Sequence, residues 1–166
     1  MSVDLSRWRD RLRHTSEQLR WLPLLIVRIC LGGLFLSTGW GKVHNLEKVT
    51  AFFTELHIPA PAFNAGLVGY SELFCGALLL IGLASRLATI PLLVSMTVAL
   101  LTAKRGDIHG ITGLFGEVEF TYLCMLFVVL VIGPGGASID GAIARALDSS
   151  RHKRGVEPSF EHAPAQ

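Results

Sequence analysis

Four charged side chains lie inside or at the ends of long apolar stretches, where they could form ion pairs or handle protons. They are Arg28, Lys42, Glu72 and Glu119. An arginine near the centre of a bilayer costs at least about 2.5 kcal/mol on insertion scales, so such a residue normally faces the protein interior and has a partner. We therefore expect a buried charge network in which Arg28 contacts Glu72, while Lys42 and Glu119 form a second, more solvent-exposed pair at the outer ends of their spans.

Four glycines accompany these charges at helical spacing. In the first apolar stretch, residues at alternating four- and three-residue steps from Arg28 share one face of the expected helix. In the second stretch, glycines lie three residues before and four residues after Glu72 and share its face. The glycines on these faces are Gly32, Gly39, Gly69 and Gly76. Because glycine allows two helix backbones to approach closely, we expect these positions to form the helix-packing contacts. The alternative for Arg28 is that it extends to the membrane interface, about 10 Å away.

The composition is that of an integral membrane protein. Hydrophobic residues make up 51% of the 166 residues, and the mean hydropathy is +0.49, which is too apolar for an ordinary soluble domain of this size. The formal net charge is only +2, so we expect no nucleic-acid partner.

Four stretches approach the length of about 20 apolar residues that crosses a bilayer as a helix. They are residues 22–42, 62–83, 87–103 and 114–133. The last must begin near Leu114, because the apolar run at 120–132 is too short by itself. The turn between the second and third stretches is also short, which favours an antiparallel arrangement. We predict an all-α integral membrane fold, an antiparallel four-helix transmembrane bundle.

The segments outside the spans carry their own patterns. Residues 1–21 place apolar and basic side chains on different faces, which predicts an N-terminal amphipathic helix in the membrane interface. A short helix is predicted between the first two spans, at about residues 46–56. Residues 134–148 predict a short C-terminal interfacial helix, and residues 149–166 a disordered polar tail.

The distribution of Lys and Arg predicts the orientation, because these residues concentrate on the cytoplasmic side. The side that carries both termini has Arg7, Arg9, Arg11, Arg13, Arg20, Arg86, Arg145, Arg151, Lys153 and Arg154. The opposite side has Lys42, Lys48, Lys104 and Arg105. Both termini should therefore be cytoplasmic.

The order and spacing of these residues resemble the DoxX family over residues 24–143. The matching positions are Arg28, Gly32, Gly33, Phe35, Gly39, Lys42, Phe52, Phe53, Pro59, Glu72, Gly76, Gly82, Arg86, Glu119 and the sequence GPGGASID at 133–140. The resemblance implies a small four-helix protein of the bacterial inner membrane. The family is named for a subunit of thiosulfate:quinone oxidoreductase, and its members occur near redox, thiol-stress and metal-stress functions. It implies no settled activity, because function has to be argued from a site.

The remaining candidates for chemistry are the histidines and cysteines. His44, His57 and His109 fall on the predicted outer side, where imidazoles could bind copper or zinc or accept protons from a quinol. Scattered loop histidines are common, so we expect no bound metal. The cysteines, Cys30, Cys75 and Cys124, form no C-x-x-C pair and are expected to be structural.

Three functions are compatible with these observations. We favour an accessory or quinone-contacting subunit of a membrane redox or stress-response assembly, non-catalytic by itself, with no covalently bound cofactor. Such a subunit has the lipid bilayer and a membrane or exported protein as partners, and a homo-oligomer is also compatible. The alternatives are a small transporter of protons, metal or solute, and a structural or assembly subunit in which the buried charges only fix helix packing.

Overall fold

The computed structural model describes residues 19, 21–106, 108 and 110–154. These residues form helices joined by turns, and none of them lies in a strand. The interfacial helix predicted over residues 1–21 falls almost wholly outside the described residues.

Within the described part of the chain, three helices are long and apolar enough to cross a membrane. They are α2 (Leu22–His44), α4 (Pro61–Ile81) and α5 (Ser85–Thr102). Prolines occupy the first turns of α2 and α4, where their missing N–H group has no helical partner to lose. Gly82 ends α4 in the left-handed conformation, with φ 75°. These three helices lie close to the first three predicted spans.

The fourth predicted span differs from a single straight helix. It consists of α6 (Gly110–Gly116) and α7 (Val118–Ile132), which meet at an angle of 71°. Glu117 has extended backbone between them, and the adjacent Gly116 is a poor helix former. The 15 residues of α7 are about 22 Å long, short of the roughly 30 Å hydrocarbon core. The apolar run therefore breaks where its composition turns to glycine and glutamate.

Two shorter segments complete the described chain. Helix α3 (Leu46–Glu55) follows α2 after Asn45, and none of its residues is buried. Helix α8 (Ile139–Arg154) begins after Ser138, whose hydroxyl caps it by accepting a hydrogen bond from Gly141 N–H at 2.9 Å. It continues past the predicted end at residue 148.

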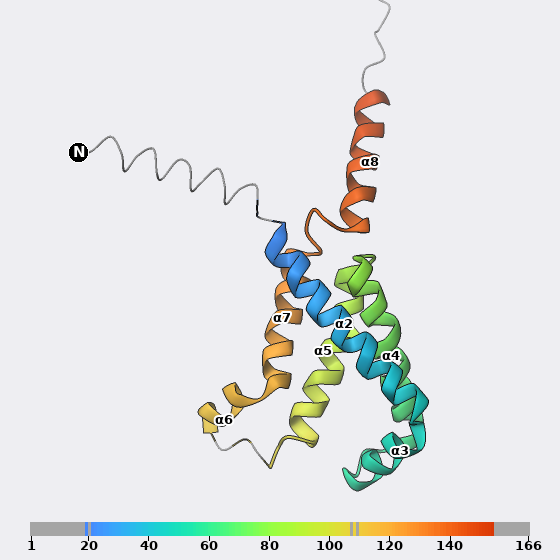
Figure 1. The fold of residues 1–166 in the computed structure, drawn as a ribbon, viewed down its shortest axis with the longest axis vertical. Helices are drawn as coiled ribbons and strands as arrows, with labels where there is room; N and C mark the ends of the chain where they lie inside the picture. Colours follow the sequence, from blue (N-terminus) through green and yellow to red (C-terminus); the bar gives the residue numbers. More distant parts are fainter. Residues whose placement is uncertain (1–18, 20, 107, 109, 155–166) are drawn as a thin grey trace, which may run out of the picture.

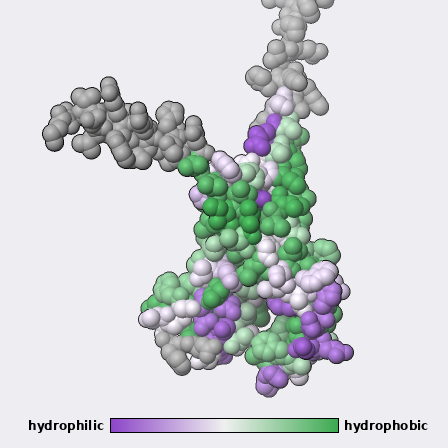
Figure 2. Space-filling view, in the orientation of Figure 1, coloured by the Kyte–Doolittle hydropathy of each residue, from purple (hydrophilic) through white to green (hydrophobic). Residues whose placement is uncertain are grey.

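Figure 1 shows α2 crossing α4, with α5 and α7 beside them, while α3 and α6 lie at one end and α8 at the other. Hydrophobic residues cover the middle of the helices, and hydrophilic residues gather at the end that carries α3 and α6 (Figure 2). A small core joins α2, α4, α5 and α7. Its buried residues are Leu31, Phe35, Leu79, Leu92, Met96, Leu126 and Val129. Many other large apolar side chains point outward, as expected of a surface that faces lipid.

Glycines set the contact between α2 and α4. A Cβ atom on Gly32 would lie 2.7 Å from the Leu80 backbone nitrogen, and one on Gly76 would lie 2.6 Å from that of Leu36. A Cβ on Gly39 would overlap the Leu73 backbone nitrogen. At these three positions the helices touch backbone to backbone. Gly69, the fourth predicted packing glycine, has a looser contact, with the Lys42 Cβ at 3.3 Å.

Substituting Gly39 should separate the two helices. We expect Gly39→Ala to lower the free energy of unfolding by about 1–3 kcal/mol, because the new methyl group meets backbone that cannot rotate away. The matched control is Gly33→Ala on the same helix, since a Cβ there has no atom within 4 Å. Chemical denaturation in detergent, followed by tryptophan fluorescence, measures both variants. Equal stability of the two variants would contradict the backbone contact.

Candidate functional site

Glu72 is the buried acid at the centre of the candidate site. It lies on α4 against the glycine gap that Gly39 leaves in α2, and only 1% of it is exposed. Lys42 Nζ is 2.6 Å from Glu72 Oε1. The Ser95 hydroxyl donates to the same oxygen at 2.9 Å, and the Thr38 hydroxyl donates to Oε2 at 3.1 Å. Helices α2 and α5 thus supply three donors to one carboxylate on α4, which compensates its removal from water.

Lys42 lies between the buried Glu72 and a less buried region of the protein. Its side chain is 30% exposed, although its ammonium group contacts Glu72. A lysine ammonium carries three N–H donors, and Glu72 accepts one of them. The remaining donors are therefore available to a molecule that binds beside the pair.

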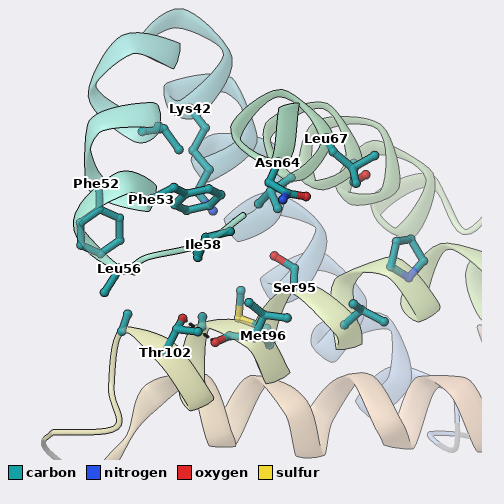
Figure 3. Close-up of a pocket in the computed structure, with 18 of the residues that line it drawn as sticks. Lys42, Phe52, Phe53, Leu56, Ile58, Asn64, Leu67, Ser95, Met96 and Thr102 are labelled. Carbon is teal, nitrogen blue, oxygen red and sulfur yellow. Dashed lines mark hydrogen bonds between the residues drawn. The ribbon is translucent and has the colours of Figure 1, made fainter. Parts of the chain in front are cut away.

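A cavity of about 750 Å³ opens beside Lys42, between α3, α4 and α5. This volume lies within the range of roughly 300–1,000 Å³ that is usual for small-molecule sites. The walls are mostly apolar, with polar groups from Lys42, Lys48, Asn64, Ser71, Ser95 and Thr102. Figure 3 shows Lys42 and Ser95 on different walls of this space, with Phe53 and Ile58 nearby. Lys42 and Ser95 thus join the cavity to Glu72.

Helix α3 and the turn after it form the wall farthest from the core. Phe52, Phe53 and Ile58 line the cavity from this side. Two non-glycine residues of the turn hold positive φ angles, 56° at His57 and 46° at Ala60. Such conformations are unfavourable for residues with a Cβ atom and are found disproportionately at ligand sites.

Arg28 occupies a different site at the opposite end of α2. It is 1% exposed, and its guanidinium donates to the carbonyl oxygens of Leu79 (3.1 Å), Leu80 (3.2 Å), Pro134 (2.9 Å) and Ala137 (2.9 Å). It thereby fastens the end of α4 to the loop before α8.

Asp140 reinforces this junction from the first turn of α8. Its carboxylate accepts hydrogen bonds from the backbone N–H groups of Ala84 (2.8 Å) and Ser85 (3.1 Å) at the start of α5. A negative charge at a helix N-terminus also interacts favourably with the helix dipole. The sequence GPGGASID, which contains Asp140, is therefore part of the packed structure.

A model of the DoxX family matches residues 23–105, half of the chain, which include Arg28, Lys42 and Glu72. The chain belongs to the DoxX family. It is 32% identical over 133 residues to "Uncharacterized membrane protein Rv3486" of Mycobacterium tuberculosis, covering 74% of this chain and 82% of that protein. It is 28% identical over 102 residues to "Putative oxidoreductase CatD" of Bacillus subtilis, covering 61% of this chain and 71% of that protein. No solved structure gives a significant match.

The DoxX chain pairs its charges differently from the prediction. Glu72 contacts Lys42 and not Arg28, so the predicted Arg28–Glu72 pair is wrong. The reason is the helix register: Gly39 faces Leu73 and Gly32 faces Leu80. Arg28 is therefore level with the end of α4, roughly a dozen residues and about 18 Å from Glu72.

The predicted Lys42–Glu119 pair is also wrong, because Lys42 already contacts Glu72. Among the described residues, Glu119 forms no ion pair, and the neighbouring Glu117 instead lies 3.2 Å from Lys104. Glu119 belongs to the first turn of α7.

The histidines and cysteines do not converge in the described part of the DoxX chain. No group of three His, Cys, Asp or Glu residues there could hold a metal ion. His44 Nδ1 lies 2.9 Å from the Trp40 carbonyl oxygen, to which it donates when protonated, and its ring packs at a tilt against the Trp40 ring, while His57 lies in the turn after α3. His109 lies outside the described residues. Cys30 and Cys124 are exposed, and all three cysteines are free.

Sequence reasoning missed two residues of the DoxX site, Ser95 and Thr38. Both are hydroxyl residues in apolar helices, and such residues often bond to their own backbone, which makes them weak signals. Ser95 lies in the stretch LLVSMTVALL, where a polar residue could have indicated a partner on a neighbouring helix. Phe52 and Phe53 of α3 are among the positions of the family resemblance, but nothing in the sequence indicates that they line a cavity.

Removing Lys42 should destabilise the protein more than removing Glu72. Lys42→Met leaves a buried carboxylate with only hydroxyl donors and should cost about 3 kcal/mol, whereas Glu72→Met leaves a lysine that can extend toward water and should cost about 1–2 kcal/mol. The double variant, Lys42→Met with Glu72→Met, leaves no unpaired buried charge and should lose only about 1 kcal/mol of stability. Chemical denaturation in detergent gives the free energy of unfolding of the wild type, the two single variants and the double variant.

The control for this cycle is the more exposed pair Lys104–Glu117, whose side chains are 35% and 15% exposed. Lys104→Met should cost no more than about 1 kcal/mol. Two results would contradict a buried pair. One is a stability loss for Lys42→Met as small as that for Lys104→Met, and the other is a loss in the double variant equal to the sum of the two single losses.

Proposed function

We propose that this DoxX chain is an accessory membrane subunit of a redox assembly and that its cavity holds the ring of a lipid-soluble quinone. The observation that carries the proposal is the placement of the Lys42–Glu72–Ser95 cluster at the wall of an otherwise apolar cavity. Family membership and the oxidoreductase name of the Bacillus relative support the same class of function.

The donor set suits a quinone ring. The free N–H groups of Lys42 can donate to a quinone carbonyl oxygen. Ser95 gives its own proton to Glu72, so its oxygen can accept a hydrogen bond from a quinol hydroxyl. Phe53 and Met96 provide apolar and aromatic surface for the ring. A bound quinone would supply two-electron redox chemistry, while the chain's own residues bind and orient it and exclude water.

The proposal places the source of electrons on a partner. In the described residues the cysteines are free and no metal-binding group forms. We assign this chain the role of presenting the quinone, with a second membrane or exported protein supplying the electrons and completing the assembly. The alternative of a small transporter predicts solute flux through liposomes that contain only this chain.

The proposed topology is four spans, with the α6–α7 pair as the bent fourth and both termini in the cytoplasm. It rests on the excess of Lys and Arg at the end that carries α8. The cavity and α3 would then face away from the cytoplasm.

Cysteine labelling of intact cells tests this topology. In a background without native cysteines, a membrane-impermeant maleimide should label Lys48→Cys on α3, whereas Ala144→Cys on α8 should react only after lysis. Both positions are exposed in the structure, so access to the reagent depends on the membrane alone. The reverse pattern would refute the proposed orientation.

Filling the cavity tests the quinone directly. Ala99 lines the cavity, so Ala99→Phe should reduce the quinone that copurifies with the protein from native membranes by about tenfold, because the ring and the new side chain cannot share the space. Leu101→Phe is the matched control on the same helix, since Leu101 is 64% exposed and outside the cavity.

Extraction with organic solvent followed by mass spectrometry measures the quinone, and melting temperatures confirm that both variants fold. Ser95→Ala should also lower the quinone content, although less, because only one hydrogen-bonding group is lost. Equal quinone content in the wild type, Ala99→Phe and Leu101→Phe would show that the quinone is carried in bulk lipid and would refute the proposal.

A further inference from the structure

The cavity is continuous with the outer surface of the helices. Leu67 on α4 and Val94 and Val98 on α5 line the cavity, and they are 52%, 59% and 42% exposed. Val94 and Val98 are four residues apart and share one face of α5. Figure 3 shows Leu67 on α4 and Ser95 and Met96 on α5 at opposite sides of the space. An apolar mouth therefore opens sideways between α4 and α5.

The depth of this mouth places it among lipid chains. Both α4 and α5 are candidate membrane spans. Val94 and Val98 lie eight and four residues before the end of α5 at Thr102, about 12 and 6 Å along its axis. With the end of α5 at the membrane interface, as the proposed topology has it, a mouth at this depth opens onto hydrocarbon.

The polar cluster lies at the inner side of the same mouth. Ser95 follows Val94 directly and donates to Glu72, and Glu72 contacts Lys42. A molecule in the cavity therefore meets hydrogen-bonding groups at one end and an apolar exit at the other. The cavity's other polar lining is Lys48 on α3 and Asn64 in the first turn of α4, together with the hydroxyl groups of Ser71 and Thr102, which lie one helical turn beyond Leu67 and Val98.

We infer that the cavity takes a ligand with a polar ring and a long prenyl tail, and that the tail leaves between Leu67, Val94 and Val98 into the bilayer. This inference rests on the proposed quinone function and adds the ligand class and its route. The ring binds at Lys42 and Ser95, and the tail crosses the α4–α5 mouth along the apolar side chains of Leu67, Val94 and Val98. The ligand thus enters from the membrane and not from water, and Val94 determines whether a tail can pass.

Narrowing the mouth tests the inference with two probes that share a ring. Menaquinone-4 carries four isoprene units, and menadione is the same naphthoquinone ring without them. Val94→Trp should weaken menaquinone-4 binding by about tenfold, as expected if about two CH₂ groups lose their burial, and should leave menadione binding unchanged. The matched control is Val131→Trp on α7, because Val131 is also 59% exposed and does not line the cavity.

Binding of each probe is measured by native mass spectrometry of the full chain in lipid nanodiscs, and melting temperatures confirm folding. If Val94→Trp and Val131→Trp have the same effect on menaquinone-4 while the wild type binds both probes, the sideways exit is wrong and the quinone site stands. If Val94→Trp weakens both probes equally, the valine contacts the ring and the exit is again refuted. If the wild type binds neither probe, the quinone function itself fails, and the inference with it.

Discussion

The close contact between α2 and α4 determines where every buried charge lies. Gly32, Gly39 and Gly76 allow the two backbones to touch, and in this register each of the three lies opposite a partner backbone. That register brings Lys42 and Glu72 together near one end of the helices and leaves Arg28 at the other end. A shift by a single turn would move the carboxylate away from its lysine and strand both charges, so the glycines specify the ion pair.

The two buried cations use different chemistry, and the difference matches their surroundings. The planar guanidinium of Arg28 divides its donors among four carbonyl oxygens, which suits a sealed junction of loop and helix ends. The compact ammonium of Lys42 pairs with one carboxylate and keeps donors free beside a cavity. Arg28 therefore closes one end of the molecule, whereas at the other end Lys42 keeps hydrogen-bond donors beside an open cavity.

Much of the fold follows from the sequence, because membrane spans depend on local composition. Prolines lie in the first turns of α2 and α4 and Gly82 ends α4, and the family model covers the residues of the resemblance from Arg28 to Arg86, although not Glu119 or the sequence at 133–140. The pairing of charges could not be predicted by counting from each span's outer end, because that count assumes level ends. Helix α3 and its turn separate the two ends, and α4 begins about nine residues beyond the level of Lys42, roughly 13 Å. For the fourth span, the sequence shows that the apolar run at 120–132 is too short to cross alone and that glycine and glutamate precede it, but not the direction or size of the 71° bend.

The position of the Lys42–Glu72 pair is informative because stability alone does not explain it. Replacing a buried ion pair with apolar residues is often neutral or stabilising, so a pair that served only packing could be exchanged for leucine and methionine. Here the carboxylate receives hydroxyl groups from two further positions, and its lysine keeps a partly exposed side chain at the wall of a cavity. Holding an ammonium donor rigidly beside an apolar space requires a buried counter-charge, since an unpaired lysine would turn toward water. Glu72 thus acts as a positioning residue: it fixes the direction of Lys42, and the cavity presents that donor to whatever polar ring enters it.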